Sequence, residues 1–177
     1  MLTPNEFHDS ANKAYQSHNY REAADLFYQA AKEYLVQGAE LSAAEMFNNY
    51  SVSLLQTGKC DTALEAVLGT AEIFEKYGDV YRQATACGNI GACYEAVGNY
   101  QKAQEYYQKS IDLFTSIGDE SLKSHTLRSL SGLQLRQGDH LSALISMQSA
   151  MKSSKDMGIK RKLLLKLLSL PQKLMEH

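Results

Sequence analysis

The sequence predicts an all-α protein made of four stacked helical repeats, and three observations lead to this fold class. One alanine recurs every 40 residues, at Ala23, Ala63, Ala103 and Ala143. Two glycine series keep the same interval, one at Gly38, Gly78, Gly118 and Gly158 and the other at Gly58, Gly98 and Gly138. Only two of the 177 residues are proline, and strong helix formers fill the stretches between the glycines. A fixed period of this length is typical of solenoids of stacked helix pairs.

The two series divide the chain into units that make one domain over residues 1–177. The expected repeats are 4–43, 44–83, 84–123 and 124–158, and a last segment covers 159–177. Each half of a unit is expected to form one amphipathic helix, which gives about nine helices with the last segment. In the later units a glycine that can end one helix is followed by Asp or Asn, which can cap the next. The first unit differs, because His18 stands where the other units have the middle glycine.

The second helix of the third unit illustrates the expected core. Ala103, Tyr107, Ile111 and Phe114 follow the spacing that places side chains on one helical face. The recurrent alanine is expected where the two helices of a unit approach closely, since a larger side chain would push them apart. Short turns between helices make neighbours antiparallel, and stacking then buries each apolar stripe.

The repeated residues resemble the tetratricopeptide repeat family over residues 4–158. In the first helix of each unit a large apolar residue is followed four positions later by a small one, and the second helix carries alanine, an aromatic residue and a small residue. The pattern is carried by Phe7, Phe47, Cys87 and Leu127, by Ala11, Ser51, Gly91 and Ser131, and by Phe27, Tyr107, Ala30, Thr70, Ser110 and Ala150. The unit is longer than the usual 34 residues and lacks the usual proline. In this it resembles LGN-type scaffolds, kinesin light chains and bacterial signalling proteins of the family.

The resemblance implies a right-handed α-solenoid with a concave groove lined by the first helix of each unit. It also implies a protein or peptide partner in that groove. Asn12, Asn49 and Asn89 are the predicted contacts, because a side-chain amide can both donate to and accept from an extended peptide backbone. Alternatively, Asn49 and Asn89 bond only to adjacent helices. Arg128 and Arg136 lie about two turns apart and are the predicted grip for an acidic group, or else are simply solvated.

The C-terminal segment differs in charge and composition from the repeats. From Met151 onward seven Lys or Arg stand against Asp156 and Glu176, and residues 160–175 read KRKLLLKLLSLPQKLM. The leading interpretation is a basic, leucine-rich helix that caps the solenoid at 159–177. One alternative is a homodimer or partner interface through Leu164 and Leu168. A helix lying on a membrane surface is the weakest, because Pro171 should end or kink it.

No catalytic or metal-binding motif emerges from the sequence. The five histidines are scattered, no phosphate-binding glycine loop is present, and Cys60, Cys87 and Cys93 lack metal or redox spacing. We therefore expect no enzyme activity, no metal and no cofactor. A net charge of −2 argues against nucleic acid, and the absence of a leader or a long apolar run argues against export and favours a cytoplasmic protein.

The sequence leaves two functions of different classes open. The first is a non-catalytic adaptor or scaffold that binds an extended peptide in the groove. The second is a scaffold that assembles with itself through the leucine-rich tail. A regulatory module of a signalling system is a further alternative.

Overall fold

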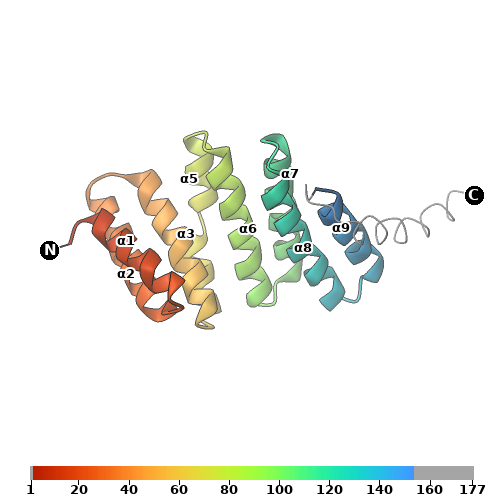
Figure 1. Ribbon diagram of the computed structural model, residues 1–177, viewed down its shortest axis with the longest axis horizontal. Coiled ribbons are helices and arrows are strands. Elements are labelled where there is room, and N and C mark those ends of the chain that lie inside the picture. The colour runs from red at the N-terminus through yellow and green to blue at the C-terminus, as the bar shows by residue number, and fades with distance from the viewer. Residues whose placement is uncertain (1, 154–177) are drawn as a thin grey trace, which may run out of the picture.

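The computed structural model describes residues 2–153, and they form a row of antiparallel helices (Figure 1). The described part contains no strand, so the predicted all-α class is confirmed. The bounds are α1 Pro4–Gln16, α2 Tyr20–Val36, α3 Glu40–Gln56, α4 Cys60–Val67, α5 Thr70–Lys76, α6 Val80–Ala96, α7 Tyr100–Ser116, α8 Glu120–Arg136 and α9 His140–Ser153.

Within residues 2–153 four helix pairs follow one another along the row. Helices α1 and α9 lie at opposite ends of it (Figure 1). The first helices of the pairs are α1, α3, α6 and α8, and the second helices are α2, the broken pair α4 and α5, α7 and α9. The first helices of the later pairs begin at Glu40, Val80 and Glu120, slightly before the expected repeat boundaries. The predicted α-solenoid is confirmed, whereas the expected capping helix at 159–177 lies outside the described residues.

The turns between helices use the predicted glycines in the left-handed conformation. Gly78, for example, has φ of 69°, and the N–H of the next residue, Asp79, donates to the Phe74 carbonyl at 2.9 Å. The following Asp or Asn then accepts a hydrogen bond from a first-turn amide, as predicted, at Asp79, Asn99, Asp119 and Asp139. His18 takes the same conformation with φ of 61°, although it is not glycine.

The second helix of the second unit differs from the expected single helix. It stops at Val67, Leu68 adopts an extended ψ of 134°, and Gly69 has φ of 85° before α5 begins. Glycine weakens a helix interior, and the hydroxyl of Thr70 offers the Val67 carbonyl another partner at 2.8 Å. Both neighbours favour a break at this point, and this is the one broken second helix among the described pairs.

The core lies between the first and second helices of each pair. Ala103, Tyr107, Ile111 and Phe114 are all buried on one face of α7, as the spacing predicts. Helices α6 and α7 approach closely there, because a Cβ added at Gly91 would lie 2.8 Å from the Tyr107 ring and 3.2 Å from the Ala103 carbonyl oxygen. Small residues at facing positions therefore set the distance between the two helices of a unit.

Candidate functional site

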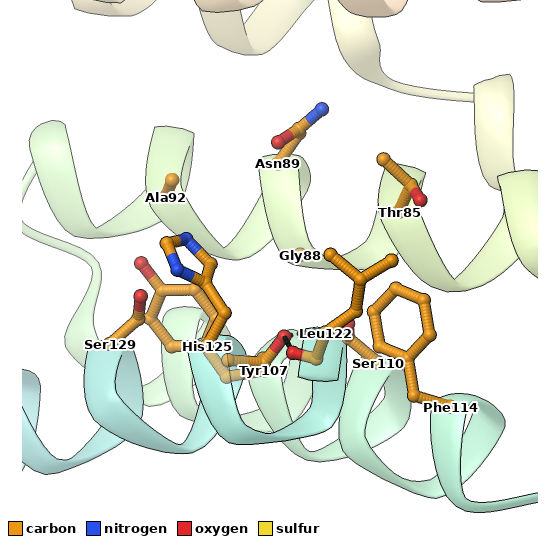
Figure 2. Close-up of a pocket in the computed structure, with 11 residues that line it drawn as sticks. Thr85, Gly88, Asn89, Ala92, Tyr107, Ser110, Phe114, Leu122, His125 and Ser129 are labelled. Atoms are coloured by element: carbon orange, nitrogen blue, oxygen red, sulfur yellow. Dashed lines mark hydrogen bonds between the residues drawn. The ribbon is translucent and has the colours of Figure 1, made fainter. Parts of the chain in front are cut away.

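Two cavities lie between successive first helices, on the side predicted to be the groove. The first, of about 320 Å³, lies between α3 and α6 over Phe74 of α5, and the second, of about 140 Å³, lies between α6 and α8 over Phe114 of α7. Thr85 of α6 lines both. The first cavity is lined by Glu45, Asn48, Asn49, Phe74, Tyr81, Arg82 and Thr85. The second is lined by Thr85, Gly88, Asn89, Ala92, Tyr107, Ser110, Phe114, Leu122, His125, Thr126 and Ser129 (Figure 2).

The two cavities are the same site repeated one unit apart. Residues 40 positions apart occupy equivalent places in the two cavities. In six such pairs the first residue lines the first cavity and the second residue lines the second: Glu45 and Thr85, Asn48 and Gly88, Asn49 and Asn89, Phe74 and Phe114, Arg82 and Leu122, and Thr85 and His125. The 40-residue period therefore applies to the cavities as well as to the turns and the core. The chemistry of the two copies differs, since the first holds charged side chains at places where the second holds neutral ones.

Asn49 and Asn89 occupy equivalent places in the two cavities but differ in their bonding. Asn89 donates from Nδ2 to Oδ1 of Asn48 at 3.0 Å, which links α6 to α3. Figure 2 shows Asn89 pointing from α6 away from α8, in keeping with this bond. Asn49 lines the first cavity and forms no side-chain hydrogen bond among residues 2–153. One amide of the predicted ladder is thus partly used within the protein, whereas the other keeps its full bonding capacity.

A small charge network borders the first cavity. The Arg82 guanidinium lies 3.2 Å from a Glu45 carboxylate oxygen and donates to Asp79 at 2.6 Å. The Arg82 backbone N–H, followed by its side chain, lowers the pKa of Asp79. The carboxylates in turn raise the pKa of Arg82. The first cavity is therefore bordered by an internally paired cluster of acidic and basic side chains.

The two predicted arginines do not share one environment. Arg136 pairs with Glu95 of α6, which also accepts a hydrogen bond from the Tyr107 hydroxyl at 2.7 Å. Arg128 is exposed and donates to the Ser124 hydroxyl of its own helix at 3.1 Å. Burial raises the pKa of Tyr107 to about 12, so this phenol stays neutral while it bonds to the carboxylate. Arg136 thus links α8 to α6, and Arg128 is the predicted cation with no carboxylate partner among residues 2–153.

Asn12 lies on α1, half-buried, and lines neither cavity. Leu164 and Leu168, the predicted oligomer contacts, lie outside the described residues. The predicted set of site residues also lacked Asn48, Arg82 and the two floor residues, Phe74 and Phe114. The 40-residue spacing of the two phenylalanines was a usable signal, whereas nothing in the sequence singles out Asn48 as the partner of Asn89.

Three further features of the described residues concern the buried thiols, metal binding and membrane spanning. Burial raises the pKa of the Cys87 thiol to about 11 and that of Cys93 to about 12, so neither forms the thiolate that a nucleophile requires. Over residues 2–153, no three His, Cys, Asp or Glu side chains come together where they could hold a metal ion. In the same range, none of the helices has the length and apolar character needed to cross a membrane.

A row of stacked antiparallel helix pairs places the protein in a class of fold, the helical-repeat solenoids. The sequence profile of the tetratricopeptide repeat family matches residues 42–116 and 81–156, which together make up more than half of the chain. The chain therefore belongs to the tetratricopeptide repeat family, as the residue pattern predicted.

Among curated proteins, the chain is 25% identical over 128 residues to response regulator aspartate phosphatase A of Bacillus subtilis strain 168. That alignment covers 64% of this chain but 34% of the relative, so the chain spans about a third of that protein's length.

Several solved structures share the fold at 19% identity. BtubC from P. vanneervenii has a TM-score of 0.76, with 85% of this chain and 62% of BtubC covered. The apo form of RapI has a TM-score of 0.77, with 85% and 55% covered. A MamA fragment from Desulfovibrio magneticus RS-1 has a TM-score of 0.66, with 87% and 78% covered. These likenesses support the solenoid fold.

Proposed function

We propose that this protein is a non-catalytic adaptor whose groove along α3, α6 and α8 binds an extended segment of a partner protein. The observation that carries the proposal is the pair of equivalent cavities, which present the same amide position twice, at Asn49 and Asn89. An extended chain repeats its N–H and C=O groups along its length, so amides repeated along a groove suit its backbone.

The bonding of these amides supports a backbone ligand. Asn49 has an unused donor and acceptor, and Asn89 keeps its Oδ1 and one N–H beyond the bond to Asn48. Membership of the tetratricopeptide repeat family also supports a protein partner, since such solenoids use their concave surfaces for binding. The groove holds paired carboxylates and arginines and no long basic stripe, which argues for protein over nucleic acid. We place this adaptor in the cytoplasm, where its three thiols would stay reduced.

The test is a selection of linear random peptides on the full chain, followed by binding titrations with synthetic peptides. The Asn49→Ala/Asn89→Ala double variant should weaken the selected peptides about tenfold or more, since each amide supplies hydrogen bonds to the backbone. Gln104→Ala is the matched control, because it removes an exposed amide of α7 that lines neither cavity. Peptides that bind the double variant as tightly as the wild type would overturn the groove proposal.

A second candidate is self-assembly through the C-terminal end of the solenoid. The observation that favours it is an apolar surface on α9, where Leu141, Leu144 and Ile145 are all exposed. Such a patch can be covered by a second copy or by the segment at 159–177. Deletion of residues 159–177 should abolish assembly in light scattering if the tail joins two copies, and a monomeric full chain at high concentration would exclude this candidate.

A further inference from the structure

The cavity between α6 and α8 has the size of a single side chain. Its volume is about 140 Å³, and an apolar cavity of roughly 150 Å³ in a protein holds one benzene molecule. The space arises from small residues on α6. Gly88 and Ala92 stand here where Asn48 and Val52 stand one unit earlier, so no large side chain from these two positions of α6 occupies this space.

The lining of this cavity differs in its charged residue types from that of its equivalent one unit earlier. It contains no Asp, Glu, Lys or Arg, whereas the first cavity holds Glu45 and Arg82 at the places of Thr85 and Leu122. Its floor is formed by the rings of Phe114 and Tyr107, both buried. A charged occupant would lose water there with no Asp, Glu, Lys or Arg in the lining to pair with, which is unfavourable.

Four hydroxyls around the cavity, those of Thr85, Tyr107, Ser110 and Thr126, already have partners. The Thr85 hydroxyl donates to the Tyr81 carbonyl at 3.0 Å, and the Ser110 and Thr126 hydroxyls lie 3.4 Å apart. The Tyr107 hydroxyl donates to Glu95. An apolar occupant would therefore leave these four hydroxyls satisfied. His125 and Ser129 form no side-chain hydrogen bond among residues 2–153, and Figure 2 shows His125 reaching from α8 toward α6.

We infer that this cavity, termed here the anchor pocket, binds one apolar side chain of the partner segment, either leucine-sized aliphatic or phenyl. The inference rests on the proposed function, because the groove must first hold an extended segment. On this inference, selectivity for the partner comes from the anchor pocket between α6 and α8. The charged cavity between α3 and α6 favours polar side chains of the same segment.

The experiment uses the peptides selected on the full chain. Their aligned sequences should share one Leu, Ile, Met or Phe position, and its replacement by alanine in a synthetic peptide should weaken binding about tenfold or more, the effect of burying such a side chain. Filling the pocket by Ala92→Leu should weaken the original peptide to a similar degree. It should leave the alanine-substituted peptide nearly unaffected, since that peptide no longer uses the pocket.

The matched control is Ala96→Leu, one turn further along α6, where the side chain is exposed and lines neither cavity. Ser129→Leu fills the pocket from α8 as a second variant, with exposed Ser121→Leu as its control. Thermal melting establishes whether each variant is folded. If Ala92→Leu is not folded, binding by Ser129→Leu and its control Ser121→Leu provides the test.

Two results would overturn the inference while leaving the adaptor intact. One is a set of peptides that need Asn49 and Asn89 but share a charged residue or no apolar position. The other is full binding by both pocket-filling variants. Peptides that ignore the Asn49→Ala/Asn89→Ala variant would instead overturn the proposed function and the anchor pocket with it.

Discussion

The carboxylate of Asp79 shows how one side chain secures the start of a repeat. It accepts from the Arg82 N–H at 3.0 Å, and this bond holds its pKa below the usual value. Because the pKa is lower in the folded than in the unfolded state, the stabilisation is complete above about pH 4, the unfolded pKa, and is lost as the pH falls through the folded pKa.

We predict that Asp79→Ala lowers the free energy of unfolding by about 1 kcal/mol at pH 7, the usual cost of removing a helix N-cap. Asp79→Asn keeps the acceptor, as Asn99 does at the start of α7, and should retain most of that stability. Urea unfolding between pH 3 and pH 7 should show a weaker acid dependence for Asp79→Asn than for the wild type. Equal acid dependence would mean that the Asp79 charge is not involved.

His18 is the exception among the turn residues, since its φ of 61° is a conformation that glycine adopts freely. Its ring bonds to the Tyr20 hydroxyl at 2.7 Å on the surface. We predict that His18→Gly raises stability by roughly 1 kcal/mol, because a side chain in this region costs about that amount. His18→Ala is the control, since it removes the ring without relieving the backbone. A lower melting temperature for His18→Gly than for His18→Ala would contradict the prediction.

At the scale of the element, two glycines have opposite roles. One lies at the break in a second helix, and the other lies inside a first helix. Gly69 has φ of 85° between α4 and α5, whereas Gly132 lies within α8, and a Cβ there would lie 3.9 Å from its nearest neighbour, Arg136 Nη2. We predict that Gly69→Ala destabilises by roughly 1 kcal/mol and that Gly132→Ala stabilises by about 0.5 to 1 kcal/mol. Calorimetry on the two variants tests the pair, and the same sign for both would contradict the assignment.

Close approach of two helices is the other feature of the element scale. Ala103 is fully buried on α7, and its carbonyl lies against Gly91 of α6. We predict that Ala103→Leu lowers the free energy of unfolding by about 1 to 3 kcal/mol, because the extra atoms must push α6 and α7 apart. An unchanged melting midpoint would show that the alanine is not a contact point. Ala96→Leu, at an exposed position, should leave the midpoint nearly unchanged.

At the scale of the whole molecule, Glu95 joins three helices of two repeats. It bonds to Tyr107 of α7 and pairs with Arg136 of α8, and its side chain is 16% exposed whereas that of Arg136 is 59% exposed. We predict that Arg136→Ala lowers the free energy of unfolding by less than about 1 kcal/mol, as is usual for exposed ion pairs. Glu95→Ala should lower it by about 1 to 3 kcal/mol, because it leaves the buried Tyr107 hydroxyl unpaired.

Hydrogen exchange complements the unfolding measurements for these two variants. Faster exchange in α8 of the Glu95→Ala protein is expected, since the link between α6 and α8 is lost. If Arg136→Ala proved as costly as Glu95→Ala, the ion pair and not the phenol would be the main link.

The candidate site illustrates the limit of prediction from spacing. The period placed Asn49 and Asn89 at equivalent positions, and both line cavities in the groove. It did not predict that Asn89 bonds to Asn48, because that choice depends on how one repeat is rotated on the next. It also placed Arg128 and Arg136 together, whereas only Arg136 finds a carboxylate, Glu95, on the neighbouring helix.

Local features of this protein were determined by its sequence alone. Helix ends, caps and buried faces depend on residues a few positions apart, so the 40-residue period sufficed to predict the repeats and their turns. The pairing of Asn89 with Asn48 and the pocket between α6 and α8 were decided by the tertiary structure. Each of these depends on which side chains meet between neighbouring helices, and that is set by stacking geometry over the whole row.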